Sequence, residues 1–335
     1  MREQLARLLE GQDLSRSEMR DAMNTIMDGC ATPAQIGAFL IALRLKGETV
    51  EEVAGGAESM RRHATGIDAG TRSVVDTCGT GGDGGSTFNI STAAALVAAA
   101  AGICVAKHGN RAVSSQCGSA DVLHHLGVNI EADPAVMEQC LQEHGIGFLF
   151  APSMHPAMKH AAGPRRELGV RTIFNMLGPL TNPAGATGQV VGVFSGHLTE
   201  MFAHVLRELG SRRAWIVHGE DGMDEITING TTRVSELRDG RVRTFQLSPE
   251  LFVEELGDGD HIKGGTPADN ARILRQVLEG RPGACRDIVL LNAGAAIVVG
   301  EQADRLEDGI RLAAEAIDSG AARGKLETLV EYSNA

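Results

Sequence analysis

Two absences narrow what this chain can be. No stretch of its 335 residues is apolar over the about 20 residues that a transmembrane helix requires. No basic run offsets the formal net charge of -12, which argues against nucleic acid or an anionic membrane as a partner. We therefore expect a globular protein without membrane contact, in which any binding of phosphate is local.

The six cysteines form no metal-binding motif. They are scattered without a C-x-x-C pair, and no signal or transit peptide is recognisable before them. We expect reduced thiols in a cytoplasmic protein and assign no metal to them. The cysteines are Cys30, Cys78, Cys104, Cys117, Cys140 and Cys285.

A glycine-rich stretch near residue 80 is the most informative part of the chain. It follows a short β-branched run, Val74–Thr77, and holds five glycines around Asp83. Asn89–Thr92 then supplies capping residues before an alanine-rich helix, and Ile103–Ala106 read as a second buried strand. This order predicts a βαβ unit with parallel strands and a right-handed crossover.

The same stretch predicts a phosphate site. Glycines let backbone N–H groups approach an anion, and the helix N-terminus near Ser91 adds unpaired donors and a positive dipole. Gly79–Gly84 also fit the dinucleotide pattern G-x-G-x-x-G, but that fold requires an acidic residue where this chain has Lys107. No Gly-Lys-Ser/Thr follows, as a P-loop would need. Lys107, Asn110 and Arg111 favour a phosphorylated ligand over the alternative that small residues merely allow tight packing.

The remaining pattern predicts an α/β protein with a mostly parallel sheet, flanking helices and a small all-helical domain. Residues 1–66 read as four short helices, and residues 162–184 are expected to return to them. Residues 67–161 and 185–335 alternate strands with helices, so that ligands should lie at the carboxyl ends of the strands. Within this part, Gly127–Ile130 read as one of the strands.

An acidic pair marks a second candidate site. Asp224 and Glu225 follow a glycine turn after the strand expected at Ala214–Val217. Such a pair can be a solvated loop, but carboxylates are also the hard oxygen ligands that magnesium prefers.

Five segments carry a family resemblance. They are GTGGDG, NIST, KHGNRAVSS, GSAD and HPAMKHAAGPRRELGVRTIFNMLGPLTNP. In this order and spacing they resemble the anthranilate phosphoribosyltransferases, over nearly the whole chain, and imply an architecture shared with the pyrimidine nucleoside phosphorylases. The resemblance implies a glycosyltransferase of L-tryptophan biosynthesis. Such an enzyme transfers the phosphoribosyl group of phosphoribosyl pyrophosphate to the amine of anthranilate and releases pyrophosphate.

The resemblance also implies roles for individual residues, none of them as general acid or base. The residues implied for the phosphoribosyl donor are Gly79, Gly82, Asp83, Thr87, Asn89, Ile90, Ser91, Thr92, Lys107, His108, Gly109, Asn110, Arg111, Ala112, Val113, Ser114, Ser115 and Ser119. Those implied for anthranilate are Gly79, His108, Asn110 and Arg165, with Arg165 facing the carboxylate. Two Mg2+ ions per subunit would be held on the diphosphate by Ser91, Asp224 and Glu225.

Two other functions stay open at this point. A pyrimidine nucleoside phosphorylase shares the architecture, although this chain is short for that family. A non-catalytic, nucleic-acid-binding relative would need a basic face, which the net charge disfavours. Family members also pair as homodimers through the helical domain, and Ile36–Leu43 there is apolar almost all round, as a helix buried on two sides would be.

Overall fold

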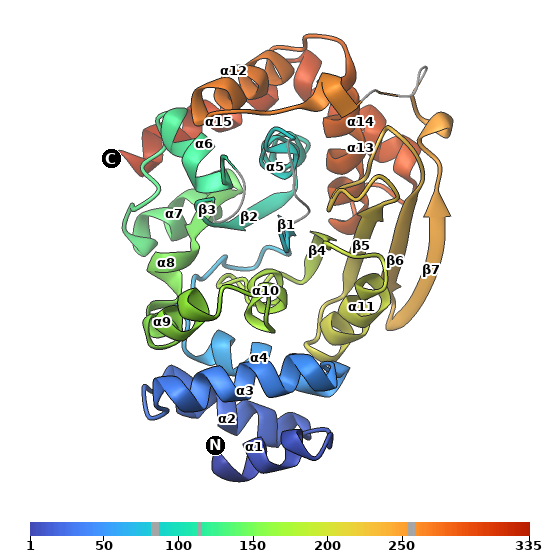
Figure 1. Cartoon of the computed structure of the whole chain (residues 1–335). Helices are drawn as coiled ribbons and strands as arrows, with labels where there is room; N and C mark the ends of the chain where they lie inside the picture. The colour runs from blue at the N-terminus through green and yellow to red at the C-terminus, as the bar shows by residue number, and fades with distance from the viewer. Residues whose placement is uncertain (82–86, 113–115, 254–256, 258) are drawn as a thin grey trace.

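A single mixed sheet organises the chain. The computed structural model describes residues 1–81, 87–112, 116–253, 257 and 259–335. Five parallel strands in the order β3-β2-β1-β4-β5 continue into the antiparallel strands β6 and β7 (Figure 1). The strands are β1 (Val74–Gly79), β2 (Cys104–Gly109), β3 (Ile146–Phe150), β4 (Gly188–Gly192), β5 (Arg213–Gly219), β6 (Thr232–Arg238) and β7 (Arg241–Leu247). The mostly parallel sheet expected from the sequence is confirmed.

Helices cover both faces of the sheet and form two hydrophobic cores. The larger core joins the sheet to α5 (Ile90–Ala100), α6 (Ser119–His125), α7 (Pro134–His144), α12 (Pro267–Leu278), α13 (Ala284–Val299), α14 (Leu306–Asp318) and α15 (Ala321–Ser333). The second core joins the opposite face to α11 (Leu198–Glu208) and to the N-terminal helices (Figure 1). Two short 3-10 turns, Pro249–Leu251 and Gly259–Ile262, precede α12.

The four helices expected in residues 1–66 are present. They are α1 (Arg2–Leu9), α2 (Arg16–Met27), α3 (Pro33–Lys46) and α4 (Val50–Arg62). Capping boxes start α2, α3 and α4, because Ser15, Thr32 and Thr49 each accept a bond from the third helical residue and that residue's side chain bonds back. Glu52 is buried and also accepts from the backbone of Leu14 over 2.9 Å, which ties the start of α2 to α4.

The segment after β3 returns to these helices, as the sequence predicts. It contains α8 (Ala151–Met154), α9 (Lys159–Leu168), α10 (Phe174–Leu177) and the 3-10 turns Pro156–Met158 and Gly178–Leu180. Helix α9 packs on α2 and α3, and α10 packs on α4. Arg61 of α4 donates to the carbonyl of Leu180 over 2.8 Å. The segment therefore connects the sheet to the helical bundle.

One predicted strand is wrong. Gly127–Ile130 forms turns and no strand. Val128 and Ile130 are buried in alternation, which imitates a strand, but the backbone of Asn129 donates to the hydroxyl of Ser333 in α15 over 3.0 Å. The segment packs against the C-terminal helix instead of the sheet. Among the described helices, none combines the length and apolar character needed to cross a membrane.

Candidate active site

The glycine loop leaves the carboxyl end of β1 and meets the acidic loop that follows β5. A Cβ atom added at Gly79 would lie 2.5 Å from Oδ2 of Asp224, so only glycine fits this approach. The backbone N–H of Gly81, which has a φ of 64°, donates to the same oxygen over 2.9 Å. Gly82 and Asp83, predicted to contact the donor, lie outside the described residues.

Helix α5 begins beside this loop. Asn89 stands at its N-cap position but its side chain makes no capping bond, so that part of the sequence prediction is wrong. Instead its Oδ1 accepts from Nδ2 of Asn270 over 2.9 Å, and its Nδ2 donates to the carbonyl of Cys117 over 3.2 Å. Thr87 forms a β-bridge with Lys263. The start of α5 is therefore held by contacts with three separate segments, which contain Asn270, Cys117 and Lys263.

Lys107 lies near the carboxyl end of β2 and is buried, with 3% of its surface exposed. Its ammonium donates to the carbonyl of Thr77 and, over 3.3 Å, to the hydroxyl of Ser91. Burial lowers the pKa of this ammonium, and the nearby Asp76 carboxylate opposes that effect. Lys107 of β2 thus links β1 to the first turn of α5.

Asp76 of β1 is a fully buried carboxylate close to Lys107. Its Oδ1 accepts from the backbone of His108 over 3.1 Å and its Oδ2 from the amide of Asn182 over 2.8 Å. Burial raises its pKa to about 6, although Lys107 acts in the opposite direction. These bonds fix where β2 ends, and therefore where Lys107 and His108 lie.

Asp121 organises the loop after β2. Its Oδ2 accepts from the backbones of Ala112 and Gly118, each over 2.9 Å, and its Oδ1 pairs with Arg111 over 3.1 Å. The hydroxyl of Ser119 donates to the carbonyl of Asn110 over 3.4 Å. Val113, Ser114 and Ser115 lie outside the described residues. Asp121 therefore holds the two described ends of the loop close together.

The three predicted metal ligands lie together. The backbone of Ser91 donates to Oε1 of Glu225 over 3.2 Å, and Asp224 meets Gly81 as described above. Both carboxylates are half-buried. Within the described residues, no group of three or more histidine, cysteine, aspartate or glutamate side chains forms a metal site. Two carboxylates and one hydroxyl form an all-oxygen set, which fits Mg2+ bound partly through a phosphate ligand and does not fit zinc.

Two neutral imidazoles, those of His108 and His155, lie next to each other near the carboxyl end of β2. The rings of His108 and His155 are 5.0 Å apart and tilted by 56°, and both side chains are buried. Burial lowers the pKa of His108 to about 3, with a further contribution from His155, and that of His155 to about 4. Both Nε2 atoms are buried without a hydrogen-bond partner in the described part of the chain. They are polar groups to which a ligand could bond.

Arg165 belongs to α9. Its guanidinium lies 4.9 Å from the ring centre of Phe174, and burial lowers its pKa. No hydrogen bond or ion pair of the described residues joins it to His108 or Asn110. The predicted acceptor residues therefore come from three parts of the fold. Gly79 ends β1, His108 and Asn110 lie at and just after the end of β2, and Arg165 belongs to α9.

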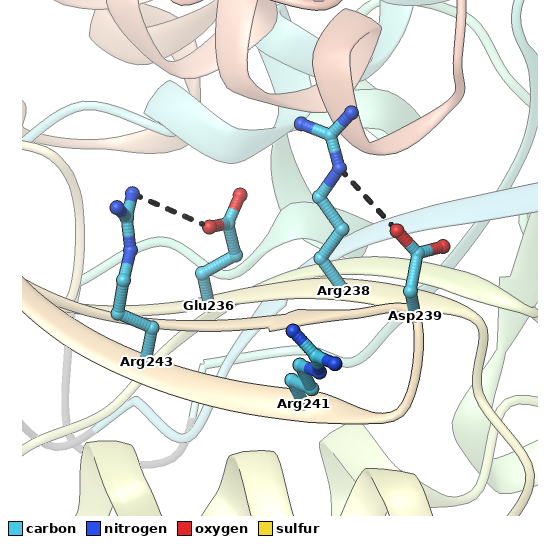
Figure 2. A pocket seen from close by; sticks show the side chains of 5 residues that line it. All are labelled: Glu236, Arg238, Asp239, Arg241 and Arg243. Atoms are coloured by element: carbon cyan, nitrogen blue, oxygen red, sulfur yellow. Dashed lines mark ion pairs between the residues drawn. The ribbon is translucent and has the colours of Figure 1, made fainter.

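A cavity at the far edge of the sheet lies apart from this site. Figure 2 shows its lining along the β6–β7 hairpin, with Arg243 paired to Glu236 and Arg238 paired to Asp239. The pairs are 3.6 and 3.8 Å apart, and Arg241 completes the lining. None of the predicted site residues lines it, so its charges do not belong to the candidate active site.

Sequence reasoning missed four buried residues that shape the site. Asp76, His155 and Asn182 belong to segments that were recognised, but these residues carry no spacing signal of their own. Asn182 and Asn292 contact the site through tertiary packing, across 106 residues to Asp76 and 66 residues to Ile226. A polar residue inside an otherwise apolar helix was the available signal for Asn292.

Known proteins match along almost the whole chain. Residues 2–64 match a glycosyl transferase family, helical bundle domain, and residues 71–323 match a glycosyl transferase family, a/b domain. The anthranilate phosphoribosyltransferase of Desulfosudis oleivorans is 58% identical over 98% of this chain and 97% of its own.

Solved structures agree. The anthranilate phosphoribosyltransferase of Thermus thermophilus has a TM-score of 0.94 at 43% identity, covering 99% of both chains. The Saccharomyces cerevisiae enzyme in complex with PRPP and Mg has a TM-score of 0.89 at 30% identity, over 98% of this chain and 96% of that one. In complex with 4-fluoroanthranilate the yeast enzyme has a TM-score of 0.87 at 29% identity, over 98% of both chains.

Proposed function

The chain belongs to the anthranilate phosphoribosyltransferases, and on that premise we propose that the carboxyl ends of β1, β2 and β5 form its active site. The family transfers the phosphoribosyl group of phosphoribosyl pyrophosphate to the amine of anthranilate in L-tryptophan biosynthesis. One observation carries the assignment. Ser91 precedes Asp224 and Glu225 by more than 130 residues, yet its backbone donates to Glu225 while Asp224 accepts from Gly81 of the glycine loop. The relatives carry the transferase name, so the phosphorylase alternative is not supported.

We assign the donor to the glycine loop, the first turn of α5 and the loop after β2. The N-terminus of α5 near Ser91 and the ammonium of Lys107 contribute positive potential at this region, which suits a diphosphate and a 5-phosphate. The proposed donor residues are those implied by the resemblance, from Gly79 to Ser119. Lys107 acts through Ser91, since its ammonium is bonded to that hydroxyl.

The Ser91, Asp224 and Glu225 set is proposed to hold Mg2+, with two ions per subunit. The yeast relative was solved with PRPP and Mg, and the oxygen ligands of this chain fit the same metal. Bound Mg2+ would neutralise charge on the diphosphate leaving group. The carboxylates already accept N–H groups of the glycine loop and of the first turn of α5, so they orient the loop and the metal together.

The acceptor is proposed to lie between Gly79, His108, Asn110 and Arg165. Arg165 would pair with the anthranilate carboxylate through two parallel bonds. An aromatic amine is neutral at pH 7, so the reaction needs alignment of the amine more than a strong base. The neutral His108 and His155 rings fit this expectation, because their unpaired Nε2 atoms offer hydrogen bonding without charge.

We further propose a cytoplasmic homodimer that pairs through the helical domain, residues 1–66 with roughly 162–184, while residues 67–161 and 185–335 bind the donor. The support is two exposed leucines of the helical domain. Leu9 of α1 is 73% exposed and Leu45 of α3 is 81% exposed, on helices that pack against each other. A second copy would cover them.

A fluorescence assay tests the function. Anthranilate fluorescence should fall when the protein, phosphoribosyl pyrophosphate and Mg2+ are mixed, and should not fall without the metal. Phosphorolysis of thymidine by the same preparation would instead support the nucleoside phosphorylase alternative.

A further inference from the structure

A single buried amide clamps the backbone next to the acidic pair. Asn292 of α13 accepts from the backbone N–H of Ile226 over 3.0 Å and donates to the carbonyl of Ile226 over 2.9 Å. Its remaining amide hydrogen bonds to the carbonyl of Ile288 in its own helix over 2.8 Å. Asn292 is 2% exposed and Ile226 is fully buried, so water does not compete for these bonds.

The position of this amide is unusual. From Ile288 to Val299, helix α13 buries apolar and glycine residues, and Asn292 is the one polar side chain buried with them. A buried carboxamide is costly unless its polar groups are bonded. Ile226 lies in no strand, so the Asn292 amide bonds both of its backbone groups as a neighbouring strand would.

The other side of the acidic loop rests on β4. A Cβ atom added at Gly192, the last residue of that strand, would overlap the backbone oxygen of Asp224. The glycine thus lets the Asp224 backbone pack directly on the sheet. Beyond Ile226, the hydroxyl of Thr227 donates to Asp221 over 2.6 Å, closing the loop on itself. Contacts on both sides fix the backbone that carries the two carboxylates.

We propose that Asn292 is a positioning residue for the metal-binding carboxylates Asp224 and Glu225. The proposal rests on the metal site given under the proposed function. Its bond to the Ile226 N–H fixes the peptide plane between Glu225 and Ile226, and its bond to the Ile226 carbonyl fixes the next one. The first of these planes and the Asp224 carbonyl, which packs on Gly192, lie on either side of the Glu225 Cα. Together they set the direction in which the Glu225 side chain leaves the backbone, toward Ser91. Outer contacts of this kind tune metal affinity without touching the metal.

Direct metal binding tests the inference. We would titrate Mn2+ with pyrophosphate present, by electron paramagnetic resonance, into the wild type, Asn292→Ala and Asn292→Asp. Both variants should bind Mn2+ about tenfold to a hundredfold more weakly. Asn292→Asp is the sharper variant, because an added negative charge near the site would by itself strengthen cation binding. The KM for phosphoribosyl pyrophosphate should rise in both, while the KM for anthranilate stays unchanged.

Two further variants interpret the outcome. Leu329→Ala removes a buried side chain from α15 and should lower stability with Mn2+ binding unchanged. Wild-type Mn2+ affinity in whichever Asn292 variants fold, or an equal rise in both KM values, would overturn the positioning role. The double variant Asp224→Asn, Glu225→Gln separates the two proposals. If it binds Mn2+ normally, the metal site is wrong; if it does not and the Asn292 variants do, only the clamp is wrong.

Discussion

The backbone N–H of Ser91 donates to Oε1 of Glu225 over 3.2 Å, so the first turn of α5 and the acidic loop are in contact. A carboxylate at a helix N-terminus is stabilised by the unpaired backbone donors and the helix dipole. The same donors suit the phosphates of the donor substrate. The acidic pair therefore lies beside the proposed phosphate site, and substitutions there should act on the donor and the metal together.

Replacing the acidic pair should stop catalysis. The double variant Asp224→Asn, Glu225→Gln removes two negative charges from the proposed Mg2+ site and keeps side chains of similar size. We expect turnover to be lost at ordinary Mg2+ concentrations, with a circular dichroism spectrum like that of the wild type. Glu220→Gln, an exposed residue of the same loop, is the matched control. Near-normal activity of the double variant would disprove the metal assignment.

Replacing Lys107 should weaken the donor far more than the acceptor. Its ammonium is bonded to Ser91, and a hydrogen bond to a charged group is worth about 1.5 to 3 kcal/mol. Lys107→Ala should accordingly raise the KM for phosphoribosyl pyrophosphate by roughly tenfold or more, measured with anthranilate saturating. Lys159→Ala, on an exposed side chain, should leave it unchanged. Equal rises in the two KM values would argue against a donor role.

Replacing Arg165 should weaken the acceptor. A charge-assisted pair is worth about 1.5 to 3 kcal/mol, so Arg165→Ala should raise the KM for anthranilate by roughly tenfold to a hundredfold. Arg165→Lys should recover part of the loss, because an ammonium keeps the charge without the two parallel bonds. The adjacent, exposed Arg166→Ala provides the control. If aniline serves the wild type as well as anthranilate does, the carboxylate is not recognised here.

The buried histidines should make stability depend on pH. Because the folded pKa of His155, about 4, lies below the ordinary value of 6.5, the unfolded chain binds more protons between those pH values. The free energy of unfolding should therefore fall as the pH drops from about 6.5 to 4, by roughly 3 kcal/mol for this residue. Urea unfolding should show a shallower fall for His155→Gln than for the wild type or for His125→Gln, on an exposed side chain. Asp76, with its raised pKa, acts in the opposite direction, and the comparison between variants cancels it. Parallel curves would contradict the assignment of a neutral His155.

The exposed leucines of the helical domain should decide the oligomeric state. Leu45→Glu would replace an exposed apolar side chain of α3 by a charged one and should shift the protein from the proposed dimer to a monomer in sedimentation velocity. Leu251→Glu changes a leucine that is 76% exposed outside the helical domain and should leave the state unchanged. A Leu45→Glu variant that sediments as the wild type does would exclude this surface as the interface.

The sequence predicted secondary structure correctly where neighbouring residues carry the signal. Cap residues place the starts of α3 and α4, and the run from β1 to β2 was recognisable because glycines, alanines and β-branched residues follow one another in a fixed order. The proximity of Ser91 to the acidic pair came from the family resemblance, and no local pattern contains it. Asn292 and His155 were not identified, because their partners are set by how distant elements pack. Gly127–Ile130 was misread for the same reason, since alternating burial against a helix looks like a strand.

The two edge strands of the sheet differ in how far they are buried. Strand β3, at one end, is buried along its whole length and packed by α7. Strand β7, at the other end, alternates exposed and half-buried residues, and its hairpin carries Arg238, Arg241 and Arg243. Charged side chains on an open edge repel a second edge of the same kind and so oppose sheet-to-sheet aggregation. The charged hairpin thus disfavours pairing of β7 with an edge strand of another molecule.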